Sequence, residues 1–190
     1  SNCSLQNLSL DNPLNADHTH ARPSLLPGLV DTLAHNQKNL NTLTRVFESG
    51  RVFRHGPRGN VELISLAFAA FADSNIREWR KKEKLDFFEL KNHLHRLLHA
   101  TGLNEPTGTW ETLFGFNPWQ DGYSSKLGDV NRNKLELHLG ILNLSLTKQK
   151  EAKGPVYAAE VLIDPVLLNR KRKNRCFVPF SSFPPAIKDI

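Results

Sequence analysis

Apolar residues recur at helical spacing in two segments of the chain. The first segment follows Ser24, a residue type that caps helices, and the pattern predicts a helix that runs to about Lys38. Its apolar positions are Leu25, Leu26, Leu29, Val30 and Leu33. The second segment follows Asp86 and Glu89, which are spaced as in a capping box, and predicts a helix that ends at Gly102. Its apolar positions are Phe87, Leu90, Leu94, Leu97 and Leu98.

Other segments have the apolar pattern of strands. Strands are predicted over residues 46–53, 61–71, 110–116 and 156–163. Residues 61–71 are so continuously apolar that we expect both faces of this strand to be largely covered. Gly56 and Gly59 predict a turn between the first two strands. Residues 135–141 alternate strictly, and the apolar phase then switches next to Gly140, which predicts either two sheet segments or one kinked strand.

Turn-forming residues separate these elements. Residues 117–129 contain Pro118, Gly122 and Gly128 and are predicted to form a loop. Asp164 and Pro165 predict a short helix. Because strands outnumber helices and only sometimes alternate with them, we expect an α+β fold. Its mainly antiparallel sheet would be flanked by helices, which we place on one side of the sheet.

Composition narrows the class of protein. The chain has 190 residues, of which 39% are apolar and 23% charged, as in a globular domain. Its two cysteines, Cys3 and Cys176, lie far apart, which disfavours a disulfide framework and fits a cytoplasmic protein. No segment approaches the roughly 18 apolar residues of a membrane span, and the start of the chain carries no signal pattern. We therefore expect a soluble protein without a membrane partner.

The net charge of +6 permits a polyanionic partner but does not require one. Two clusters of basic residues stand out. The first, a candidate nucleic-acid site, consists of Arg170, Lys171, Arg172, Lys173 and Arg175. The second consists of Arg77, Arg80, Lys81 and Lys82. Neither cluster has interleaved aromatic residues for base stacking, so a solvated loop or helix end is favoured for both.

Motifs for catalysis or cofactor binding are weak throughout. His95 and His99 stand four residues apart on the second helix and could share a zinc ion, but the pattern lacks the glutamate of H-E-x-x-H. His18 and His20, with Asp17 nearby, favour a linker over a metal site. No nucleophile elbow, phosphate-binding loop or dinucleotide fingerprint occurs. The residues thus predict no catalytic, cofactor-binding or metal-binding position.

Landmarks along most of the chain resemble those of the phenylalanyl-tRNA synthetase β-subunit family. The matching segments are Asn12 to Leu14, Arg22 to Leu29 with Asn36, residues 46–53, Trp79 with residues 85–91, residues 154–168 and residues 177–189. They occur in the family's order over roughly residues 8–190, so coincidence is a poor explanation. The resemblance implies a fold like the core of class II aminoacyl-tRNA synthetases.

The resemblance also implies that the nucleotide site of such a core is lost. In class II synthetases an arginine of a strand-loop-strand motif holds the α-phosphate of ATP, and a glutamate two residues later holds the adenine. Arg54 matches that arginine, but Gly56 stands in the glutamate position. The third motif should end in an arginine, whereas this chain has Asp164 and Pro165 there and no arginine until Arg170. Arg54 is therefore expected to be a structural ion-pair partner.

The function implied is that of a non-catalytic core domain in the β subunit of an (αβ)₂ ligase, supporting ATP-dependent attachment of phenylalanine to its tRNA. The α subunit and tRNA would be partners, and ATP and Mg²⁺ would bind elsewhere in the enzyme. We expect residues 1–7 to be a tag scar or disordered start, residues 8–183 the core, and residues 184–190 the start of a linker to a further domain. The chain would be an excised piece without activity of its own. Two alternatives are a free-standing RNA-binding module that uses residues 170–175 and a histidine-metal hydrolase.

Overall fold

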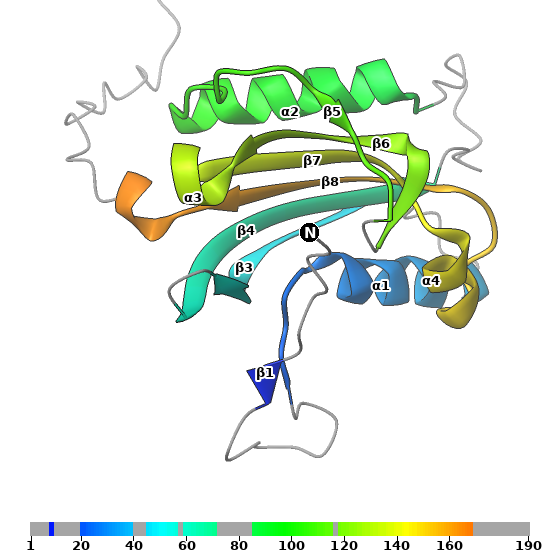
Figure 1. Ribbon diagram of the computed structural model, residues 1–190. Coiled ribbons are helices and arrows are strands. Elements are labelled where there is room, and N and C mark those ends of the chain that lie inside the picture. Colours follow the sequence, from blue (N-terminus) through cyan, green and yellow to red (C-terminus); the bar gives the residue numbers. More distant parts are fainter. Residues whose placement is uncertain are drawn as a thin grey trace, which may run out of the picture.

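An antiparallel sheet of six strands, in the order β3-β4-β8-β7-β6-β5, forms the centre of the fold (Figure 1). The computed structural model describes residues 8–9, 20–39, 45–56, 59–71, 85–115 and 118–168. The strands are β1 (Leu8–Ser9), β2 (His20–Ala21), β3 (Arg45–Gly56), β4 (Gly59–Phe71), β5 (Glu111–Thr112), β6 (Trp119–Asp129), β7 (Leu135–Leu142) and β8 (Val156–Ile163). The helices are α1 (Leu26–Lys38), α2 (Phe87–Thr101), α3 (Val130–Asn133), α4 (Leu144–Gln149) and the 3₁₀ helix η1 (Pro165–Leu167). β1 and β2 form a separate two-stranded sheet. The α+β class with a mainly antiparallel sheet is confirmed.

Helices cover both faces of the large sheet (Figure 1). On one face α1 packs with residues such as Val52, Leu63 and Leu162, and on the other α2 packs with residues such as Leu137 and Val161. The expectation that helices lie on one side is therefore wrong. Its physical reason is that the central strands carry apolar side chains on both faces, and each face must be removed from water.

The two helices predicted from apolar spacing are present. Asp86 caps α2 as predicted, whereas the N-cap residue of α1 is Leu25, and Ser24 binds the start of this helix from one residue earlier. The Leu26 N–H donates to Ser24 Oγ at 3.1 Å, and the Glu89 N–H donates to Asp86 Oδ1 at 2.8 Å. Gly102 ends α2 in the left-handed conformation, with φ at 72°. Local sequence signals and packing agree at these two helices.

We predict that Asp86→Ala lowers the free energy of unfolding by about 1 kcal/mol, because the Glu89 N–H loses its acceptor at the start of α2. Chemical denaturation monitored by circular dichroism measures the change. Asp86→Asn is the matched control, since asparagine caps about as well as aspartate, and it should unfold near the parent. Equal losses in both variants would contradict the capping role.

Residues 119–129 form strand β6, so the loop predicted over residues 117–129 is wrong for all of its described part except Pro118. The strand contains an irregularity: its register with β7 shifts between Trp119 and Ser124. Gly122 and Gly128 have positive φ values of 75° and 81°. The residues that suggested a loop thus supply the backbone conformations of a bulged strand.

Two further predictions need correction. The strand predicted over residues 110–116 is shorter than expected and consists of β5 alone, Glu111–Thr112. It ends early because the chain turns at Gly115, which has a φ of 64° and whose N–H donates to Asp121 Oδ1 at 2.6 Å. After β7 the chain forms neither a second sheet segment nor a kinked strand but helix α4, for which the Asn143 side chain accepts from the Ser145 N–H at 2.7 Å. The predicted strands around β3, β4 and β8 are confirmed, as is the short helix after Asp164.

Candidate functional site

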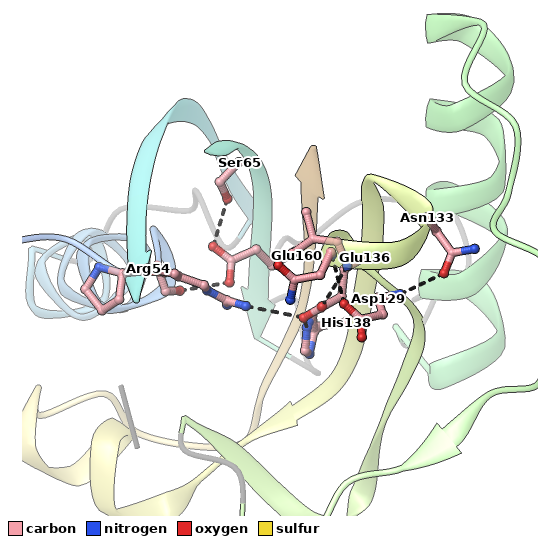
Figure 2. A network of polar contacts seen from close by, with 11 residues as sticks. Arg54, Ser65, Asp129, Asn133, Glu136, His138 and Glu160 are labelled. Atoms are coloured by element: carbon pink, nitrogen blue, oxygen red, sulfur yellow. Dashed lines mark hydrogen bonds and ion pairs between the residues drawn. The ribbon is translucent and has the colours of Figure 1, made fainter. Parts of the chain in front are cut away.

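A network of polar side chains lies within the apolar layer on the α1 face of the sheet (Figure 2). Ser65 comes from β4, Glu160 from β8, and Glu136 and His138 from β7; all four are less than a tenth exposed. Strand register places Glu160 directly opposite His138. Because polar groups are rarely buried without partners, this is the most distinctive chemistry in the described part of the chain.

Glu160 joins three elements that are distant in sequence. One carboxyl oxygen accepts from the Leu25 N–H at 3.1 Å and from Ser65 Oγ at 2.8 Å, and the other accepts from Ser24 Oγ at 2.9 Å. Ser24 and Leu25 precede α1, so this one side chain connects the start of that helix to β4 and β8. The residue is 1% exposed, so these three contacts lie away from solvent. It therefore acts as a structural anchor.

Glu136 is the centre of the second half of the network. Its Oε1 lies 2.5 Å from His138 Nε2 and 3.3 Å from Arg54 Nη1, and its Oε2 accepts from the Val130 N–H at 3.2 Å. The His138 ring stacks on Trp119, with centroids 5.9 Å apart and planes 12° apart. Both rings are buried. The two halves of the network face each other across β7 and β8.

The charge around Glu136 determines its protonation. Burial alone would raise the pKa of its carboxyl group, but the hydrogen bond and charge of His138, the charge of Arg54 and the Val130 N–H together lower that pKa from 4.5 to about 2. The folded state thus binds a proton more weakly than the unfolded state. This difference links the stability of the fold to pH.

We predict that acid weakens the fold between the two pKa values of Glu136. Its ionised carboxylate contributes fully above about pH 4.5, and the contribution disappears as the pH falls toward 2, where the folded state is protonated as well. A shift of this size corresponds to about 3 kcal/mol. Urea unfolding across this pH range measures it, and Glu136→Gln should flatten the pH dependence while lowering stability at neutral pH.

A matched control for this experiment is Glu62→Gln, because Glu62 is paired with Arg51 at an exposed position. Below about pH 4.5, the free energy of unfolding of this variant should fall with pH as it does in the parent protein. Arg54→Met, which removes one of the charges that lower the pKa of Glu136, should move the acid transition to higher pH. If Glu136→Gln and Arg54→Met both lose stability in acid as the parent does, Glu136 is not the cause of the acid dependence.

Arg54 is held by the chain itself. Its Nη1 lies 3.3 Å from Glu136 Oε1, its Nε donates to the Pro23 carbonyl at 3.4 Å, and its side chain is 18% exposed. The expected ion pair of Arg54 is therefore present, and the expectation that the residue does not bind ATP stays a prediction. Glu48, on the same strand, is paired with Arg22 instead.

The other candidates are dispersed. Of the histidine pair on α2, His95 Nε2 lies 3.3 Å from Glu105 Oε2, and His99 is exposed in the last turn of the helix. Among the residues that the structure describes, no three histidine, cysteine, aspartate or glutamate side chains are grouped so that they could hold a metal ion. The nucleic-acid candidates Arg170, Lys171, Arg172, Lys173 and Arg175 lie outside the described residues, as do His18 and the cluster of Arg77, Arg80, Lys81 and Lys82. For those residues the sequence interpretation stays a prediction.

Sequence reasoning missed the network, although a signal was present. Residues 135–141 alternate, and the face opposite the leucines consists of Glu136, His138 and Gly140. Once a strand is known to be central and covered on both faces, polar residues on its second face must be buried and paired. The missing information was the position of β7 inside the sheet.

In the described residues, no helix is long and apolar enough to cross a membrane.

Comparisons with known proteins place the chain in a family. The family profile described as "Phenylalanyl tRNA synthetase beta chain CLM domain" matches residues 3–163. Phenylalanine–tRNA ligase β subunits from Chlamydia pneumoniae and Synechococcus are each 30% identical to it, over 90% and 94% of this chain. The chain spans only about a fifth of these relatives, 21% and 22% of their lengths.

Solved structures support the fold. A pyrrolysyl-tRNA synthetase from Desulfitobacterium hafniense superposes with a TM-score of 0.52 at 19% identity, covering 85% of this chain and 52% of the other. A second structure of that organism's enzyme gives a TM-score of 0.51 at 16% identity, over 86% of this chain and 52% of the other. This likeness shows a class II synthetase fold, as expected from the sequence. With the profile matching most of its length, the chain belongs to the phenylalanyl-tRNA synthetase β-chain family.

Proposed function

We propose that this chain is the non-catalytic, class II-like core of a phenylalanine–tRNA ligase β subunit. In that role it supports the ATP-dependent attachment of phenylalanine to tRNA by a cytoplasmic (αβ)₂ enzyme. The α subunit carries out the chemistry with ATP and Mg²⁺, and tRNA is bound by the whole assembly. Family membership supports the β-chain role.

The observation that carries the non-catalytic part of the proposal is the ion pair of Arg54 with Glu136. The resemblance aligns Arg54 with an arginine that binds the α-phosphate of ATP, a group that needs an available cation. Here the guanidinium is mostly buried and its Nη1 already faces a carboxylate with a pKa lowered to about 2. A phosphate at this position would have to displace an ionised Glu136. The pair therefore favours a structural core over a nucleotide site.

Calorimetric titration of the chain with ATP and with phenylalanine, in the presence of Mg²⁺, tests this proposal. We expect no saturable heat at millimolar ligand. The contrary result is saturable ATP binding that is lost in Arg54→Ala but kept in Arg51→Ala. Arg51 is the matched control, because it lies on the same strand, is exposed and pairs with Glu62. That outcome would mean that the nucleotide site survives.

A further inference from the structure

Arg22 is bonded to the outer edge of the large sheet. β3 is the first strand of that sheet, so one side of its backbone has no neighbouring strand there. The Phe53 N–H donates to the Arg22 carbonyl at 2.9 Å, and Arg22 Nε donates to the Arg51 carbonyl at 3.2 Å. A single residue thus satisfies two backbone groups of β3 on the side away from β4.

The position of Arg22 is that of one residue of an added strand. In a parallel strand pair, a residue accepts from the N–H that follows its partner residue and donates its own N–H to the carbonyl that precedes the partner. The Arg22 carbonyl accepts in this way opposite Val52, but the side-chain Nε donates in place of the backbone N–H. Pro23 comes next, and because proline has no N–H it cannot continue such a pairing. The contact is therefore limited to one residue.

Two residues of β3 keep the guanidinium of Arg22 in this position. Its Nη1 lies 2.7 Å from Glu48 Oε1, which makes an ion pair along the edge. Gly50 provides the space, because a Cβ atom there would lie 2.4 Å from Arg22 Nη2. Glycine inside a strand weakens it and often marks a site where another group approaches closely. The glycine in the middle of β3 therefore has a specific use, which is to admit the Arg22 side chain.

We propose that Arg22 blocks the addition of another strand to the outer edge of β3 along residues 51–53. A strand edge with unpaired backbone groups is a template for pairing with other chains, and proteins prevent this by covering the edge or placing charges on it. Arg22 does both, since its carbonyl and Nε take the backbone groups while its cation lies over Gly50. The inference rests on these contacts and is independent of the proposed function.

Light scattering of the 190-residue chain over a wide range of concentration tests the proposal. Arg22→Ala frees the Arg51 carbonyl and removes the cation, so we expect this variant to associate at about tenfold lower concentration than the parent. Gly50→Ala should do the same although it keeps Arg22. Its new Cβ atom would displace the guanidinium, which is the end of a flexible side chain, and leave the strand in place.

Arg51→Ala is the matched control. It removes an exposed cation of the same strand, paired with Glu62, but keeps the backbone carbonyl that Arg22 Nε contacts, so it should associate like the parent. Ser49→Pro, added to Arg22→Ala, locates the association. The Ser49 N–H points to the same side of β3 as the Arg51 carbonyl, and an edge strand tolerates its loss. The double variant should return to the behaviour of the parent.

Each variant is measured at a temperature at which circular dichroism shows it folded, and Gly50→Ala alone decides if Arg22→Ala does not fold. The proposal is overturned if the folded variants associate at the same concentration as the parent. It is also overturned if Arg51→Ala associates as readily as Arg22→Ala, because loss of charge would then be sufficient. Association that Ser49→Pro leaves unchanged overturns it as well, because another surface would be responsible.

Discussion

Replacing Glu160 by alanine is expected to lower the free energy of unfolding by about 3–5 kcal/mol. The substitution leaves Ser24 Oγ, Ser65 Oγ and the Leu25 N–H without their acceptor in a region from which water is excluded. The hydroxyl groups can rotate toward other acceptors, but the Leu25 N–H is fixed by the backbone. The start of α1 would also lose its attachment to β8.

Two substitutions separate this effect from a general sensitivity of the sheet. Glu160→Gln keeps an acceptor oxygen for Leu25 and Ser65 and an amide that can donate to Ser24, so its loss should be about 1 kcal/mol. Glu62→Ala, at an exposed pair with Arg51, should change stability by less than about 0.5 kcal/mol. Denaturant unfolding of all three measures the order. If Glu160→Ala unfolds at the same denaturant concentration as Glu62→Ala, Glu160 does not anchor the start of α1.

Replacing Gly140 by valine is expected to have a comparable effect, a loss of about 3–5 kcal/mol, or to prevent folding. A Cβ atom at this position would lie 2.4 Å from Ser124 Cα and 2.5 Å from the Tyr123 carbonyl oxygen, both of them backbone atoms of β6. The backbone of Gly140 also has a positive φ of 148°, which residues with side chains rarely adopt. Relief of the clash would require β6 to move away from β7.

Gly28→Ala is the matched control for this prediction. Gly28 lies in α1, and a Cβ atom there would meet nothing within 4 Å. The change should raise stability by about 0.5–1 kcal/mol, because alanine favours the helix. Thermal unfolding distinguishes the two signs directly. A Gly140→Val variant with the same unfolding temperature as the parent protein would show that β6 can shift at little cost in free energy.

The sequence predicted those elements in which local signals agree with the tertiary structure. α1 and α2 each have a single apolar face, and α2 has a cap at Asp86. β8 is apolar at most positions, with Glu160 as the exception, because both of its faces are covered. β6 was missed because Pro118, Gly122 and Gly128 are typical of loops. Only the neighbouring strand β7 shows that the two glycines accommodate a shifted register.

Helix α4 was missed for a similar reason. Leu142, Leu144 and Leu146 alternate as a strand would, but Leu144 is 55% exposed, whereas Leu146 packs against the core. The cap at Asn143, not the apolar spacing, marked the helix. In the site, the family resemblance singled out Arg54 as an ion-pair residue, whereas Glu136, 82 residues away, could not be identified as its partner. Pairing across the sheet depends on strand order, which one sequence does not contain.

The position of β8 has a consequence for how the chain acquires its structure. Among the described strands, β8 comes last in the sequence but lies between β4 and β7, and Glu160 on it bonds to groups 95 and 136 residues earlier. During synthesis, β3 can pair with β4, and β6 can pair with β7, before β8 is made. The edges of β4 and β7 that later bind β8 stay unpaired until residues 156–163 emerge. Folding dominated by such distant contacts is slow, and unpaired edges invite aggregation. This part of the nascent chain is therefore most exposed to misassembly just before residues 156–163 are made.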